Sequence, residues 1–137
     1  MSHAIDLDAV RWRLGSPVEI VERISDLIRG YSFRFANENE LQAGIFDALV
    51  ANHLSPQREL VRGGDRYDLA IEVTESDLIV IETKIAGSAA ALLRQLHRYA
   101  CSGVVLGLIA VVSRQHLAPQ VGELNGKPLR TVVLTCL

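Results

Sequence analysis

Apolar residues recur at helical spacing in two stretches near the start of the chain. In residues 17–29, valines, isoleucines and leucines return every three or four positions, which is typical of a helix with one buried face. Ser16 suits the N-cap of this helix, Pro17 its first turn and Gly30 its end. A second apolar stripe in residues 37–53 predicts another helix. We therefore expect the first third of the chain to be helical.

The pattern then changes to a period of two. Residues 59–62 predict a short strand, and residues 67–73 alternate between apolar and polar side chains. Residues 78–85 are almost entirely apolar up to Glu82, which is typical of a central strand covered on both sides. The alternation predicts one shared face for four side chains, namely Tyr67, Leu69, Ile71 and Val73.

The last third of the chain predicts a helix, a strand and a final strand. The helix should begin at Gly87-Ser88 and end near Cys101, and the strands should span residues 104–112 and 129–137. A strand, a helix and a strand in this order imply a parallel pair joined by a crossover. The expected fold class is therefore α/β, with a central mixed β-sheet flanked by helices.

Composition narrows the class of protein. The 137 residues are 49% hydrophobic, which is enough for a core, and the length suits a single domain over residues 1–137. The longest apolar run, residues 104–112, falls short of the roughly 20 residues that span a membrane, so we expect no membrane partner. Cys101 and Cys136 are interpreted as apolar core residues without a disulfide, which favours a cytoplasmic location. A net charge of −2 gives no general attraction to nucleic acid.

Charged residues interrupt the apolar strand at its end and suggest a reactive site. Glu82 and Lys84 are two positions apart and should share one face of the strand, where burial is costly unless the charges are paired or bind a metal. The preceding strand supplies Asp68. A three-residue hairpin loop at residues 75–77 would place Asp68 opposite Lys84, with Glu82 one pleat further along. Two carboxylates suit Mg²⁺ or Mn²⁺, which can polarise a phosphate oxygen, while Lys84 can offset the charge that develops there.

These residues resemble a known group of nucleases. Asp68 followed by Glu82-Thr83-Lys84 resembles the PD-(D/E)xK nuclease superfamily, with Tyr67 in place of the usual proline. Glu40 matches the acidic residue on an early helix, and the segment from Gln95 to Tyr99 resembles the Q-x-x-x-Y motif of the RecB-like branch. The resemblance covers about residues 37–112. Small Holliday junction resolvases are a second related group of similar size.

The resemblance implies a fold and a role for each residue. It implies a restriction-endonuclease-like catalytic core over residues 37–112, preceded by a helical extension (1–36) and followed by a C-terminal strand region (113–137). It implies that Asp68, Glu82 and the Thr83 carbonyl bind the metal and that Lys84 is the catalytic lysine. It also implies that Glu40 reaches the metal through water and that Gln95 orients Lys84.

The expected activity is hydrolysis of DNA phosphodiester bonds with Mg²⁺ or Mn²⁺, in repair, recombination or defence. DNA is the expected partner, with no organic cofactor, and four side chains are candidates for contacting it: Arg66, Arg94, Arg98 and Tyr99. A homodimer would allow both strands of a duplex to be cut, with residues 131–137 as a candidate edge for pairing.

Less specific interpretations stay open from the sequence alone. The domain could share the nuclease fold yet bind nucleic acid or protein without catalysis, or it could be an unrelated α/β domain whose charges are structural. Glu40 has capping-box spacing from Asn37, so it could cap its own helix. Gln95 and Tyr99 lie four positions apart on one helical face and could simply bond to each other.

Overall fold

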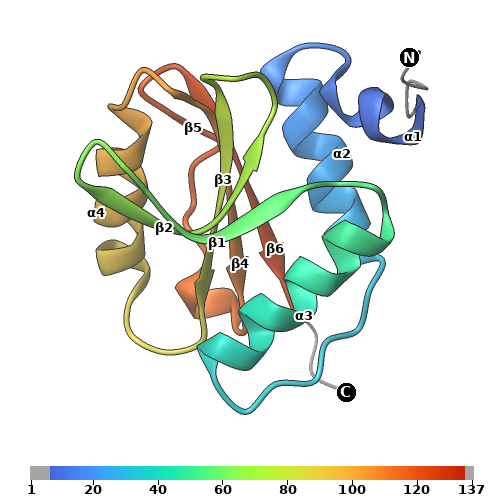
Figure 1. The fold of residues 1–137 in the computed structure, drawn as a ribbon. Coiled ribbons are helices and arrows are strands. Elements are labelled where there is room, and N and C mark those ends of the chain that lie inside the picture. The colour runs from blue at the N-terminus through green and yellow to red at the C-terminus, as the bar shows by residue number, and fades with distance from the viewer. Residues whose placement is uncertain (1–6, 135–137) are drawn as a thin grey trace.

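The protein, described over residues 7–134 by a computed structural model, has an α/β fold built on a mixed six-stranded sheet. Helices α2 and α3 cover one face of the sheet and α4 covers the other (Figure 1). The strand order is β1-β2-β3-β4-β6-β5. The elements are α1 (Leu7–Val10), η1 (Arg11–Arg13), α2 (Pro17–Arg29), α3 (Glu38–Ala51), β1 (Pro56–Arg62), β2 (Asp65–Glu72), β3 (Leu78–Lys84), α4 (Ala89–Ala100), β4 (Val105–Val112), η2 (Gln115–Leu117), β5 (Glu123–Leu124) and β6 (Lys127–Val133).

The helices begin where their capping residues predict. The Ser16 hydroxyl accepts from the Glu19 N–H and the Glu19 carboxylate accepts from the Ser16 N–H, which forms a capping box at α2. Asn37 caps α3 and Ser88 caps α4 in the same way through their side-chain oxygens. The three predicted helices are confirmed. They could be predicted because their capping signals are local in sequence. None of the helices within residues 7–134 has the length and apolar character needed to cross a bilayer.

The sheet combines an antiparallel part with a parallel part. Strands β1, β2 and β3 pair antiparallel, whereas β3 pairs with β4, and β4 with β6, in parallel. The predicted parallel pair of residues 78–85 and 104–112 is confirmed. A side-chain carbon at Gly107 of β4 would lie 2.4 Å from Val21 Cγ2, so α2 packs directly on the bare backbone of the central strand.

Several sequence-based expectations require correction. Tyr67 does not share a face with Leu69 but packs in the cluster beneath α4. Cys101 is exposed, so its assignment to the core was wrong, and Cys136 lies outside the described residues. The last strand starts at Lys127 and ends at Val133, and the final positions of the predicted strand also lie outside the described residues. The β5–β6 hairpin was not predicted.

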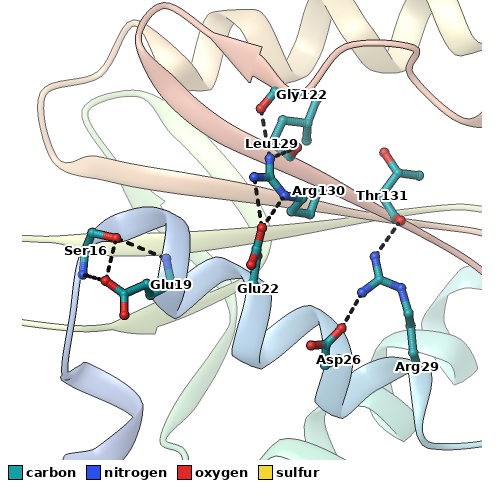
Figure 2. A network of polar contacts seen from close by, with 9 residues as sticks. All are labelled: Ser16, Glu19, Glu22, Asp26, Arg29, Gly122, Leu129, Arg130 and Thr131. Carbon is teal, nitrogen blue, oxygen red and sulfur yellow. Dashed lines mark hydrogen bonds and ion pairs between the residues drawn. The ribbon is translucent and has the colours of Figure 1, made fainter.

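Helix α2 also packs against β6, and polar contacts join the two elements, as Figure 2 shows. Arg130 of β6 donates to Glu22 and to two backbone carbonyls, while Arg29 bridges Asp26 and the carbonyl of Thr131 at 2.7 and 3.2 Å. In the described part of the chain, strand β5 pairs only with Lys127 and Pro128 of β6. Arg29 therefore donates to the Thr131 carbonyl on a part of β6 that has no second neighbouring strand within residues 7–134.

Candidate functional site

The sheet is interrupted on both sides of Asp68. The β2–β3 pairing ends at Leu69 and Ile81, and the β1–β2 pairing omits the pair that would join Asp68 to Glu59. Glu59 has a left-handed backbone with φ of 54°, which costs a residue other than glycine about 1–3 kcal/mol. This break also accounts for the change of face at Tyr67, because regular alternation holds only where the strand is regular.

Side-chain carboxyls occupy the opening in the sheet. Glu82 Oε1 accepts from the Asp68 N–H at 3.0 Å. Asp68 Oδ2 accepts from the N–H and from the hydroxyl of Thr83, at 3.0 and 3.1 Å. The Thr83 N–H is therefore bonded to a carboxylate instead of to the backbone of β2. Because the N–H and C=O of one strand residue point to the same side, the Thr83 carbonyl faces the same break.

The register differs from the sequence-based expectation. Leu69 pairs with Ile81, and continuing this register places Asp68 opposite Glu82 rather than opposite Lys84. Val73 N–H donates to the Asp77 carbonyl at 2.9 Å, so the loop comprises residues 74–76 and not residues 75–77. Both loops have the same length, and for this reason the two carboxyl groups still meet although the predicted partner of Asp68 was wrong.

Glu82 is deeply buried for an acidic residue. Its side chain belongs to a residue that is only 2% exposed. Burial raises the pKa of Glu82 to about 9, and the charge of Asp68, a hydrogen bond with the Asp68 side chain and the charge of Glu38 add to the shift, while the Asp68 N–H opposes it. In the metal-free protein at neutral pH, this shift favours the protonated form of Glu82. A cation placed beside it would favour the carboxylate form.

Lys84 ends β3 beside the turn that leads to α4. Its side chain packs against Gly87, where an added Cβ would lie 3.2 Å from Lys84 Cε. The amine forms no ion pair with any residue of the described range 7–134. Lys84 also lines an open cleft along α4, together with Ala91, Arg94, Gln95 and Arg98. The lysine thus faces a surface that a large substrate can reach.

Gln95 and Tyr99 bond to each other. Gln95 Nε2 lies 2.8 Å from the Tyr99 hydroxyl, which donates to the carbonyl of Arg66 at 2.9 Å. Tyr99 also meets Tyr67 edge to face, with ring centroids 4.8 Å apart. Burial raises the pKa of Tyr99 to about 12, with Glu82 contributing next, so Tyr99 stays protonated. Gln95 shares the cleft with Lys84, and its hydrogen bond goes to Tyr99.

Glu40 serves its own helix. Its carboxylate accepts from the Ala36 N–H at 2.7 Å, and its N–H donates to the Asn37 side chain at 2.8 Å. Glu38 is the acidic residue of α3 that approaches the site, because it accepts from the Ile85 N–H at 3.2 Å and influences Glu82. The sequence-based interpretation missed Glu38. The available signal was its spacing of four from Gln42, since both then lie on one helical face.

Most of the candidate DNA-contacting arginines are engaged with acidic neighbours. Arg66 pairs with Glu59 at 2.7 Å, and Arg98 pairs with Asp65 at 3.1 Å while lying over the Tyr99 ring. Arg94 is exposed on the cleft and forms no ion pair within the described part of the chain. The basic character of this surface is therefore concentrated at Arg94 and Lys84.

The donor set at the break is small but chemically consistent with a hard cation. Within residues 7–134, no group of three histidine, cysteine, aspartate or glutamate side chains stands close enough to hold a metal ion. Mg²⁺ commonly uses one or two protein carboxylates and completes its shell with water and substrate phosphates. Asp68, Glu82 and the Thr83 carbonyl fit that pattern, and within residues 7–134 Glu82 forms no ion pair that would compete with a bound metal for its carboxylate form.

Comparison with protein-family models gives no match for this chain, and neither curated proteins nor solved structures match it.

Proposed function

We propose that this chain is a divalent-metal-dependent deoxyribonuclease with a restriction-endonuclease-like core of the PD-(D/E)xK type. The observation that supports this most strongly is the meeting of Asp68 and Glu82 at a break in the sheet, two positions from Lys84, which forms no ion pair with any other described residue. A purely structural site would be expected to compensate a buried carboxyl with a cation or with several donors. Glu82 instead has a pKa raised to about 9.

Each residue has a role in the proposed reaction. Asp68, Glu82 and the Thr83 carbonyl would hold Mg²⁺ or Mn²⁺, which when bound polarises a phosphate oxygen. Lys84 would orient the attacking water and offset negative charge that builds on the phosphate. Tyr99, which is bonded to Gln95, links α4 to β2 through the Arg66 carbonyl.

DNA would reach the site along the cleft beside α4. Arg94 is the exposed cation there, and Arg66 and Arg98 would contact phosphates after exchanging their acidic partners for the substrate. Glu40 has no place in this scheme beyond the cap of α3. A homodimer and a cytoplasmic role in repair, recombination or defence remain part of the proposal.

The test is metal-dependent cleavage of linear, circular and branched DNA, with EDTA as the blank. Wild type should cleave with Mg²⁺ or Mn²⁺, and Asp68→Asn should lose both cleavage and the thermal stabilisation that the metal provides, because a ligand stabilises only a protein that has its site. Asp47→Asn, the same charge change on the exposed side of α3, should behave as wild type. Absence of cleavage by wild type under all conditions would refute the enzyme.

A binding domain of the same fold without catalysis is the second candidate. The pairing of Arg66 and Arg98 with acidic residues and the lack of a three-carboxylate cluster within residues 7–134 favour it. This candidate predicts DNA or protein binding that EDTA leaves unchanged. The nuclease proposal instead predicts that the affinity for DNA increases when the divalent metal is present.

A further inference from the structure

A chain of hydrogen bonds joins three elements of the fold to Asp68. Arg58 of β1 donates from Nη2 to Gln42 Oε1 of α3 at 3.2 Å, and Gln42 Nε2 lies 3.2 Å from Thr83 Oγ1 of β3. The Thr83 hydroxyl continues the chain to Asp68 Oδ2 at 3.1 Å. Four side chains that are far apart in sequence therefore form one connected path.

The direction of every bond in this chain is fixed by chemistry. Arginine has only donors, so the Gln42 oxygen must accept and its amide nitrogen must face Thr83. The Thr83 hydroxyl accepts that amide proton, and its single hydrogen is then left for Asp68. All donors consequently point toward the carboxylate, and the opposite polarity would leave Arg58 facing a second donor.

The chain lies largely away from water. Gln42 is 8% exposed and Thr83 is 2% exposed, and Arg58 is half-buried with its Nη2 also bonded to the Asn39 side chain at 2.7 Å. Hydrogen bonds in such surroundings are stronger than at the surface, and a lost partner leaves a buried group unsatisfied. The chain can therefore hold Asp68 in one rotamer.

We propose that Arg58, Gln42 and Thr83 form a polarised relay that fixes Asp68 through Oδ2 and leaves Oδ1 for a divalent cation. This inference rests on the proposed function for the identity of the ligand. The relay residues are positioning residues: none of their side chains needs to touch the substrate. Removing an outer partner of a metal ligand typically weakens metal affinity by about 10- to 100-fold.

The first test uses NMR in EDTA and needs no metal. The Thr83 hydroxyl proton should exchange slowly enough to be observed, and the Thr83 amide proton should carry the shift of a bond to a carboxylate. Gln42→Met has nearly the same volume and removes both polar ends, so it should abolish the hydroxyl signal. Gln57→Met, on the exposed neighbour of Arg58, is the matched control and should leave the signal intact.

The second test measures Mn²⁺ affinity by calorimetry. Thr83→Val and Gln42→Met should each weaken Mn²⁺ binding by about tenfold. Thr83→Ser keeps the hydroxyl and should bind Mn²⁺ with the affinity of wild type. Melting curves identify any variant that fails to fold. If Gln42→Met fails to fold, the affinities of Thr83→Val and Thr83→Ser are compared instead.

The outcomes separate this inference from the proposed function. If wild type binds no Mn²⁺, the proposed metal site is refuted, and the metal-free NMR experiment alone decides whether the relay orients Asp68. If wild type binds Mn²⁺ and Thr83→Val binds it equally well, the relay is refuted while the nuclease survives. An absent hydroxyl signal in wild type, with the Thr83 amide unaffected by Gln42→Met, also overturns the relay.

Discussion

Two polar networks cross this molecule, and they differ in their access to water. The first joins α2 to β6, where Arg130 and Glu22 have 30% and 54% of their side chains exposed. The second runs from Arg58 to Asp68 through residues that are nearly inaccessible. Water and salt screen the first, so each exposed ion pair contributes only about 0–1 kcal/mol. The middle of the second, at Gln42 and Thr83, is shielded from water, and each lost partner there costs about 1–3 kcal/mol.

The two networks also end differently. In the α2–β6 network, each arginine meets a carboxylate and a backbone carbonyl, so its charge is compensated (Figure 2). The buried network ends at Asp68 and Glu82, where two acidic groups meet and where Lys84 has no ion pair in the described part of the chain. Compensated networks are typical of structural contacts, whereas groups with strongly perturbed pKa values cluster more often at functional sites.

Lys84→Ala should give the largest effect. If the lysine offsets charge on the reacting phosphate, cleavage should fall by about 10²- to 10³-fold while Mn²⁺ binding is retained. Single-turnover cleavage and calorimetry measure the two quantities. Lys127→Ala removes the other lysine of the sequence and should leave cleavage unchanged. If Lys84→Ala cleaved DNA as fast as wild type, the Lys84 amine would have no catalytic role.

Glu82→Gln should change how stability depends on pH. The native pKa of Glu82 is raised to about 9 from 4.5, so between these values the native state keeps a proton that the unfolded chain releases. The free energy of unfolding of the metal-free wild type should therefore decrease as pH rises through this window, and the variant should lack that decrease. Urea unfolding in EDTA at about pH 5 and about pH 8.5 measures it. Glu22→Gln is the exposed control, and an equal slope in Glu82→Gln would contradict the assignment.

Breaking the exposed network should have a smaller effect. A double-mutant cycle of Glu22→Ala and Arg130→Ala should give a coupling of about 0.2–1 kcal/mol that decreases with added salt. Chemical unfolding at low and high salt is the measurement. Neither variant should alter cleavage, and a loss of cleavage would mean that the α2–β6 network reaches the site.

Arg29→Ala should have the smallest effect on stability, within about 0.5 kcal/mol. It frees the Thr131 carbonyl on β6, so self-association through this strand should increase at a given concentration. Sedimentation velocity of wild type and variant compares the two. Equal association would show that the Arg29 contact does not protect the strand.

Much of the fold could be predicted because its signals are local. Ser16, Asn37 and Ser88 each cap a helix within one turn, and the apolar stripes determine which face is buried. The β5–β6 hairpin had a signal as well, since Asn125-Gly126 is a strong two-residue turn. It was missed because β5 contributes only two residues, Glu123 and Leu124, which show no alternation.

The site was harder to predict because its geometry depends on tertiary packing. A loop of residues 74–76 and one of residues 75–77 fit the sequence equally, and the β2–β3 register of the folded sheet, with the bond between Val73 and Asp77, distinguishes them. Glu40 had the right position on its helix, but the local cap competes for its carboxylate. The relay could not be found from sequence, because Arg58, Gln42 and Thr83 belong to three elements that meet only in the folded sheet.

The bare backbone at Gly107 has a consequence for how this sequence can diverge. Because a side-chain carbon there would overlap Val21, positions 21 and 107 share one fixed volume between α2 and β4. A larger residue at position 107 is compatible with the same helix position only if position 21 becomes smaller at the same time. In a set of diverged relatives, these two positions should therefore vary together, as an apolar pair of constant total size.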